Sequence, residues 1–224
     1  MLRLNSHHLI NNFPEGSSFF KRVFGQLAFL FMVTKVTPRK NHLTEADYHQ
    51  ALSTIKKGDV ILVGGFRSIS GFFLGKLFTH SLLYQGDGEC VHASVDGVDT
   101  VGLSELFNEY DSLAILRPKI GDVEEKVIEK ALTFAREQLG KPYDFYFEHV
   151  SDRHYCTLLI NTAFSQAGFD AGLNVEERVK RPLLVIRLHR VVKADRFLRG
   201  NFRLAFLSES LKGREREIED LMKK

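Results

Sequence analysis

Residues 79–94, which read THSLLYQGDGECVHAS, predict a β-hairpin. Two strand-like runs flank the turn sequence at 85–89, which carries two glycines. Antiparallel pairing centred on residue 87 places His80 opposite Ser94, and a shift of one residue in each strand places it opposite His92. Opposite Cβ atoms lie roughly 5 Å apart and diagonal ones roughly 7–8 Å, so the two imidazoles can meet if they share a face. The alternative is two unrelated histidines, one of them bonded to a backbone carbonyl.

Further strands and helices are predicted on both sides of this hairpin. Short apolar runs predict buried strands at 59–63 and 113–117, and weaker signals predict strands at 98–101 and 183–192. Thr44 and Asp47 form a capping-box pattern at the start of a helix, and Gly140 ends another. The predicted helices cover residues 44–55, 68–78, 103–109, 122–139, 156–167 and 208–224.

Composition indicates a globular chain with a sizeable core. The 224 residues are 44% apolar and 26% charged, which excludes wholesale disorder and fibrous repeats. Two cysteines are too few for a disulfide framework or a four-cysteine zinc module. We expect an N-terminal extension at 1–43, a catalytic domain at 44–205 and a charged C-terminal helix at 206–224.

The N-terminal extension contains an apolar run of 11 residues from Val23 to Val33. A membrane-spanning helix needs about 20 such residues, and no small-residue cleavage site follows the run. We expect a helix that is buried or packs on the domain; a membrane-surface helix and an export signal are the alternatives. The expected location is cytoplasmic, with peripheral attachment to an anionic membrane surface as a candidate. Basic residues bracket the run: Lys21, Arg22, Lys35, Arg39 and Lys40.

Cys156 stands where a helix is predicted to begin. A helix N-terminus stabilises the reactive thiolate, and its free N–H groups can bind an oxyanion. A cysteine there, with an imidazole on a facing strand, would form an acyl-transfer site. The alternative is a small buried side chain with no chemical role.

Four short motifs, taken in their order along the chain, resemble those of the permuted papain-like amidases of the YiiX/YaeF type, which are relatives of the NlpC-like cell-wall peptidases. In that family, as here, the cysteine helix follows the histidine strand. The resemblance implies an α+β, circularly permuted papain-like fold, in which a small antiparallel, barrel-like sheet packs against the helix that carries the nucleophile. The motifs are Lys57-Gly58-Asp59-Val60-Ile61-Leu62, Thr79-His80-Ser81-Leu82-Leu83-Tyr84, Gly140-Lys141-Pro142-Tyr143-Asp144 and Tyr155-Cys156-Thr157-Leu158-Leu159-Ile160.

The resemblance also implies roles for particular residues. Cys156 matches the nucleophile, His80 the base, and His92 the third polar residue that orients the base. Tyr143 matches a tyrosine that lines the site and helps to bind the oxyanion, and Tyr155 is grouped with it as a substrate or oxyanion residue. The implied activity is that of a cysteine hydrolase, an amidase or peptidase that forms a thioester acyl-enzyme and needs no cofactor.

One departure from the family pattern and one likeness to another branch keep a second activity open. The family's Cys-Ser-Glu-Leu start reads Cys156-Thr157-Leu158-Leu159 here, so the glutamate is missing. A histidine twelve residues after the first resembles the lecithin-retinol-acyltransferase-like branch, although that branch's Asn-Cys-Glu start is absent. The alternative activity is therefore a membrane-associated phospholipase or acyltransferase. The expected substrate is a peptide, an amide or a small lipid-linked molecule.

Cys90 precedes His92 by two residues, so both should point to one face of the sheet. A non-catalytic scaffold with a zinc site made by His80, Cys90, His92 and Cys156 is a further alternative, as is a Cys90–Cys156 disulfide. We expect instead that Cys90 is a small buried residue and that no metal is bound.

Residues 178–203 carry nine Lys or Arg against a single acid, Asp195. Such a stretch is usually a solvated face, although it can attract an anionic membrane or an acidic substrate. No nucleic-acid-binding motif accompanies it, so no nucleic-acid partner is expected.

Overall fold

The computed structural model describes residues 13, 16–33, 42–65, 77–121, 124–144, 151–173 and 192–223. The predicted strand at 183–192 and helix at 68–78 lie almost entirely outside these residues. Asp122, predicted to cap the helix at 122–139, also lies outside them.

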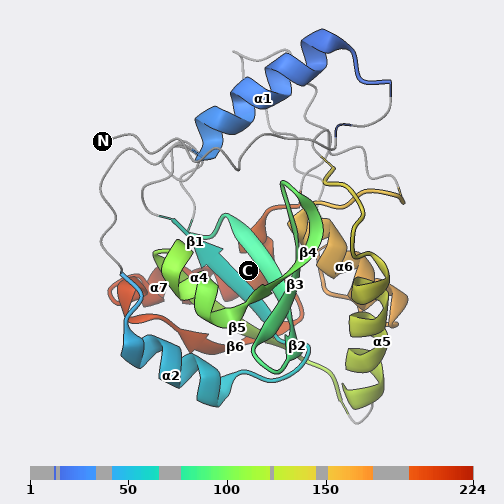
Figure 1. The fold of residues 1–224 in the computed structure, drawn as a ribbon. Coiled ribbons are helices and arrows are strands. Elements are labelled where there is room, and N and C mark those ends of the chain that lie inside the picture. The colour runs from blue at the N-terminus through green and yellow to red at the C-terminus, as the bar shows by residue number, and fades with distance from the viewer. Residues whose placement is uncertain are drawn as a thin grey trace.

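A six-stranded sheet forms the centre of the molecule (Figure 1). Its order is β4-β3-β2-β1-β5-β6, and every neighbouring pair is antiparallel. This mixed architecture confirms the predicted α+β, papain-like fold. The strands are β1 (Val60–Gly64), β2 (His80–Gly86), β3 (Glu89–Ser94), β4 (Gly97–Gly102), β5 (Ser112–Pro118) and β6 (Phe202–Leu207).

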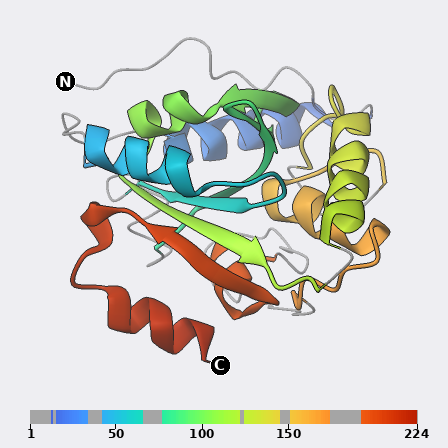
Figure 2. The same ribbon diagram turned by 90° about the horizontal axis from the view of Figure 1, so that it is seen from below.

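Helices cover both faces of the sheet, and Figures 1 and 2 show α5 and α6 side by side at one end of the molecule. The main helices are α1 (Phe19–Val33), α2 (Glu45–Thr54), α4 (Leu103–Glu109), α5 (Glu124–Glu137), α6 (Cys156–Gln166) and α7 (Glu215–Met222). Two short 3-10 helices, η1 (Ala194–Arg199) and η2 (Glu209–Leu211), precede and follow β6. No helix among the described residues is long and apolar enough to cross a bilayer.

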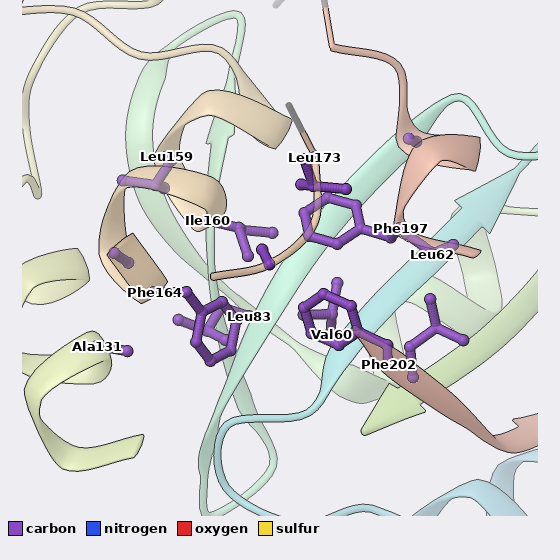
Figure 3. Close-up of a cluster of buried hydrophobic side chains, with 14 of the residues drawn as sticks. Val60, Leu62, Leu83, Ala131, Leu159, Ile160, Phe164, Leu173, Phe197 and Phe202 are labelled. Atoms are coloured by element: carbon purple, nitrogen blue, oxygen red, sulfur yellow. The ribbon is translucent and has the colours of Figure 1, made fainter. Parts of the chain in front are cut away.

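The core divides into two apolar clusters, one on each face of the sheet. Strand β1 contributes to both, because successive side chains point to opposite faces: Val60 and Leu62 join the first cluster, Ile61 and Val63 the second. Helices α5 and α6 cover the first cluster, and α2 and α4 cover the second. Figure 3 shows the first cluster, where aromatic and aliphatic side chains from α6, η1 and β6 meet the strands.

The hairpin is present as β2 and β3, in the register centred on residue 87. Leu83 pairs with Val91, and Tyr84 pairs with Cys90. The turn takes positive φ angles at Gly86, Asp87 and Gly88, which explains the two glycines. Extending this register places His80 opposite Ser94, so His80 and His92 are diagonal neighbours on one face.

The C-terminal region contains the predicted charged helix as α7, but this helix covers only Glu215–Met222 and not the whole of 206–224. Residues 202–207 form β6, which pairs with β5 and packs Phe202 and Leu204 on the first core cluster and Phe206 on the second. Gly213, with φ +92°, then separates η2 from α7. Leu211 and Ile218 are fully buried in the first cluster.

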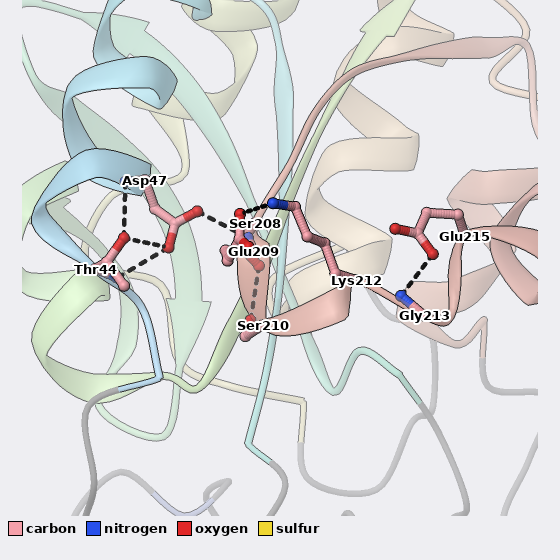
Figure 4. Close-up of polar contacts among 8 residues, drawn as sticks. All are labelled: Thr44, Asp47, Ser208, Glu209, Ser210, Lys212, Gly213 and Glu215. Atoms are coloured by element: carbon pink, nitrogen blue, oxygen red, sulfur yellow. Dashed lines mark hydrogen bonds and ion pairs between the residues drawn. The ribbon is translucent and has the colours of Figure 1, made fainter.

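Asp47 joins the start of α2 to this C-terminal region (Figure 4). Its Oδ2 accepts a hydrogen bond from the Thr44 N–H at 2.9 Å, and the Thr44 hydroxyl accepts one from the Asp47 N–H at 3.1 Å. This confirms the predicted capping box. The other carboxylate oxygen of Asp47 accepts a hydrogen bond from the Glu209 N–H at 2.8 Å.

A buried ion pair joins β5 to the residue just before β1. Arg117 donates from Nε to Oδ1 of Asp59 at 2.8 Å and from Nη2 to Oδ2 at 2.6 Å. Asp59 also accepts a hydrogen bond from the Lys56 N–H, and Arg117 also donates one to the Thr54 carbonyl. Burial raises the pKa of Asp59, and the hydrogen bonds from Arg117 and Lys56 oppose that rise.

We predict that Arg117→Met lowers the free energy of unfolding by about 3–5 kcal/mol, because it leaves a buried carboxylate without its partner. The loss should be larger at pH 8 than at pH 5, since protonation of Asp59 removes the unpaired charge. Urea denaturation at both pH values measures it. Lys212→Met, which removes an exposed ion pair with Glu209, is the control and should cost less than about 1 kcal/mol. Equal losses for the two variants would contradict the prediction.

Candidate active site

His80 and His92 lie in direct contact at the start of β2 and near the end of β3. Nε2 of His80 is 2.9 Å from Nδ1 of His92, and the ring planes meet at 70°. The expectation that the two imidazoles reach each other is therefore confirmed.

Both imidazoles are neutral at physiological pH. Burial lowers the pKa of His80 to about 3, with a further contribution from His92, and burial lowers the pKa of His92 to about 4. Asp99 and Glu105 act in the opposite direction on His92. Two neutral rings at this distance share one proton, so one nitrogen donates and the other accepts. Because Nε2 of His80 contacts His92, Nδ1 is the ring nitrogen of His80 that remains for contact with another group.

Cys156 is the first residue of α6, as predicted, and its side chain lies against β2. Burial raises the pKa of its thiol, and hydrogen bonds from the Ser81 N–H, the Ser81 hydroxyl and the N–H groups of Thr157 and Cys156 oppose that rise. Ser81 directly follows His80 in β2. The thiol therefore lies beside the backbone that carries the proposed base.

Ser81 was not predicted as a site residue. Its side chain is fully buried, and its hydroxyl has no hydrogen-bond partner of normal geometry among the described residues, although it lies close enough to the Cys156 thiol to lower the pKa of that thiol. A buried hydroxyl without a partner is costly, so its place beside the thiol indicates a role there. The sequence gives no signal for it, because Ser81 reads as an ordinary strand residue.

Tyr110, directly after α4, is a second residue that the sequence did not indicate. Its ring lies nearly parallel to that of His80, with centroids 6.3 Å apart and planes at 11°. Burial raises the pKa of Tyr110, and the negative charges of Glu109 and the Cys156 thiolate add to the rise. Tyr110 thus lies near both the imidazole and the thiol.

Tyr143 is brought to the cysteine by the backbone. It forms an isolated parallel bridge with His154, and the Asp144 N–H donates to the His154 carbonyl at 3.1 Å. His154 precedes Cys156 by two residues, so this bridge fixes Tyr143 beside the start of α6. Burial raises the pKa of Tyr143, and the charge of the Cys156 thiolate contributes to the rise.

Tyr155 caps α6 and is almost fully buried. Its hydroxyl accepts a hydrogen bond from the Val192 N–H at 3.3 Å. Burial, partly offset by that bond, raises its pKa to about 12. Tyr155 therefore ties the start of α6 to Val192, two residues before η1, and a contact with substrate stays a prediction.

The predicted zinc alternative is wrong for the described part of the chain, where no three His, Cys, Asp or Glu side chains are placed to hold a metal ion together. Cys90 is fully buried among the apolar side chains of the second core cluster, and burial raises its pKa to about 12. Both cysteines are free thiols, which also contradicts the disulfide alternative.

We predict that the histidine pair makes the fold sensitive to acid. Each imidazole has a lower pKa in the folded protein than in the unfolded chain, so the unfolded chain binds more protons below about pH 6.5. Stability should therefore fall as the pH drops from 6.5 toward 4, by up to about 1.4 kcal/mol per pH unit for each histidine.

Urea denaturation at pH 7, 6 and 5 tests this, with His92→Asn as the variant. The variant should show a shallower pH dependence than the wild type, whereas His49→Asn, at an exposed position on α2, should not. An unchanged slope in His92→Asn would contradict the prediction.

We predict that Ser81→Ala slows alkylation of Cys156 by iodoacetamide at pH 7 by about tenfold. Loss of a hydrogen bond to the thiolate raises the thiol pKa and reduces the reactive fraction. The measurement uses a Cys90→Ala background, so that a single thiol is present. Ser112→Ala removes a buried hydroxyl that donates to the Gly64 carbonyl, and it should leave the rate unchanged. Equal rates in both serine variants would remove Ser81 from the site.

Comparison with known proteins identifies the family and the fold. The family model described as permuted papain-like amidase enzyme, YaeF/YiiX, C92 family matches residues 54–178, more than half of the chain. The crystal structure of metalloprotein yiiX from Escherichia coli O157:H7 has a similar fold, with a TM-score of 0.58 and 19% sequence identity over 68% of this chain and 97% of that one. No curated protein matched the chain. On the evidence of the family match, the chain belongs to the permuted papain-like amidases of the YaeF/YiiX type.

Proposed function

We propose that this chain is a cysteine-dependent amidase or peptidase in which Cys156, His80 and His92 form the catalytic group. The observations that carry the proposal are the 2.9 Å contact between the imidazoles of His80 on β2 and His92 on β3, and the place of Ser81, the residue after His80, beside the Cys156 thiol, whose pKa it lowers. A nucleophile, a base and a residue that orients the base are the three parts that thiol acyl transfer requires.

The proposed reaction begins with proton transfer from the Cys156 thiol to Nδ1 of His80. A proton on Nε2 of His80, donated to Nδ1 of His92, leaves Nδ1 with a free electron pair for this step. The sulfur then forms a bond with the carbonyl carbon of an amide. The carbon–nitrogen bond breaks as the amine takes the proton from His80. Water hydrolyses the thioester, which releases the acid and restores the thiol.

The negative charge on the carbonyl oxygen needs donors in the transition state. The N–H groups of Cys156 and Thr157 lie in the first turn of α6, where no intrahelical acceptor is available to them. They already act on the thiolate, and the Cys156 N–H is the proposed oxyanion donor. The Tyr143 hydroxyl is the proposed second donor, since burial keeps that phenol protonated.

The structural neighbour from Escherichia coli is described as a metalloprotein. The described residues of this chain provide no matching ligand cluster, so the proposed steps use protein groups alone. The acyltransferase or phospholipase alternative uses the same thiol, and no contact in the described site favours it. Peptides, amides and lipid-linked amides remain the proposed substrate class.

We predict that Cys156→Ala abolishes covalent labelling by a peptidyl acyloxymethyl ketone, because the thiol that the probe alkylates, with loss of its carboxylate group, is gone. His80→Asn should reduce labelling by about 100-fold or more, since the base is lost. Labelling is followed by intact-protein mass spectrometry, with circular dichroism to verify folding.

Two matched variants complete the experiment. Cys90→Ala removes the other thiol and His49→Asn removes an exposed imidazole, and both should label like the wild type. Undiminished labelling of folded Cys156→Ala would overturn the proposed mechanism.

A further inference from the structure

Helix α1 presents an apolar stripe to solvent. Five of the seven large apolar side chains that are exposed in the described residues belong to this helix, and Phe19 and Phe20 are 74% and 82% exposed. At 3.6 residues per turn, the five positions fall within a sector of about 140°, so they form one face. They are Phe19, Phe20, Val23, Phe24 and Leu27.

The helix is held from another side, which leaves this stripe open. A Cβ atom at Gly25 would lie 2.8 Å from the ring of Phe13, so that ring sits against the helix at Gly25, outside the stripe. None of the described α1 side chains belongs to either core cluster. Figure 1 shows α1 at the periphery, away from the sheet. The described α1 side chains are therefore not buried in the core, and packing of this helix on the domain, the other part of the first expectation, stays a prediction.

The sequence that contains the stripe is basic. Residues 16–44 contain no Asp or Glu, but they contain five Lys or Arg. Helical spacing places position 21 beyond one border of the stripe and position 22 beyond the other, and Arg22 is exposed. Basic residues that border an apolar face are typical of helices that lie in the membrane interface.

We propose that α1 docks on an anionic lipid surface, with the Phe19–Leu27 stripe buried in the interface and the basic residues on lipid phosphates. The helix has 15 residues and is about 22 Å long, so it is suited to lying in the interface rather than crossing about 30 Å of hydrocarbon. A second copy of this chain is a poorer occupant, because a symmetric pairing of two stripes would bring like charges together. The proposal does not depend on the chemistry of Cys156.

The experiment is co-sedimentation of the full chain with two kinds of vesicle. One kind contains phosphatidylcholine alone, and the other also contains about 30 mol% phosphatidylglycerol, which makes its surface strongly anionic. The wild type should bind the anionic vesicles and bind less as salt increases. Phe19→Ser/Phe20→Ser should weaken binding by about tenfold or more, because two exposed rings no longer enter the interface. Lys21→Glu/Arg22→Glu should weaken it by at least about fivefold per residue.

Leu52→Ser/Leu139→Ser is the matched control, since these two exposed apolar residues lie outside α1. It should bind like the wild type, and thermal unfolding should be unchanged in the Phe19/Phe20 variant because both rings are exposed. Equal binding of neutral and anionic vesicles, or equal binding by the wild type and the Phe19/Phe20 variant, would overturn the proposal. The proposal would also be overturned if the wild type did not bind vesicles and instead formed a dimer that the Phe19/Phe20 variant does not form.

Discussion

The packing of α6 across β2 and β3 is the interaction on which the candidate site depends. Leu159, Ile160, Ala163 and Phe164 are fully buried in the first core cluster, and each large apolar side chain buried in this way contributes about 1.5–3 kcal/mol. That burial fixes the helix axis, and the axis fixes its first residue, Cys156, beside the start of β2. The position of the thiol therefore follows from apolar contacts made one and two turns further along the helix.

The same burial has an electrostatic cost at the site. It raises the pKa of the Cys156 thiol and lowers the pKa of both histidines, so the resting groups are a neutral thiol and neutral imidazoles. The Ser81 groups and the N–H donors of the first turn oppose this effect by stabilising the thiolate. Neutral resting groups suit the proposed mechanism, in which proton transfer accompanies acyl transfer.

Local sequence signals were sufficient for much of the fold and for part of the site. The turn glycines and the two strand-like runs determined the hairpin, and residues twelve apart along it met as predicted because pairing in a tight hairpin is a local event. The capping box at Thr44, the helix that begins at Cys156 and the buried strands β1 and β5 follow from equally local patterns. The family resemblance supplied the order of the motifs, which the family match confirms.

Other features were decided by tertiary structure, because they join segments far apart in the chain. Ser81 and Tyr110 carry no distinctive pattern, and they meet the thiol or the imidazole only once α6 and the end of α4 are in place. Strand β6 was missed because its sequence does not alternate regularly and lies between a basic stretch and a charged tail, so that only pairing with β5 stabilises it as a strand. The sequence thus determined which residues could react and which elements hold them. Long-range packing decided which of those residues share one environment, since the burial that shifts their pKa values exists only in the assembled core.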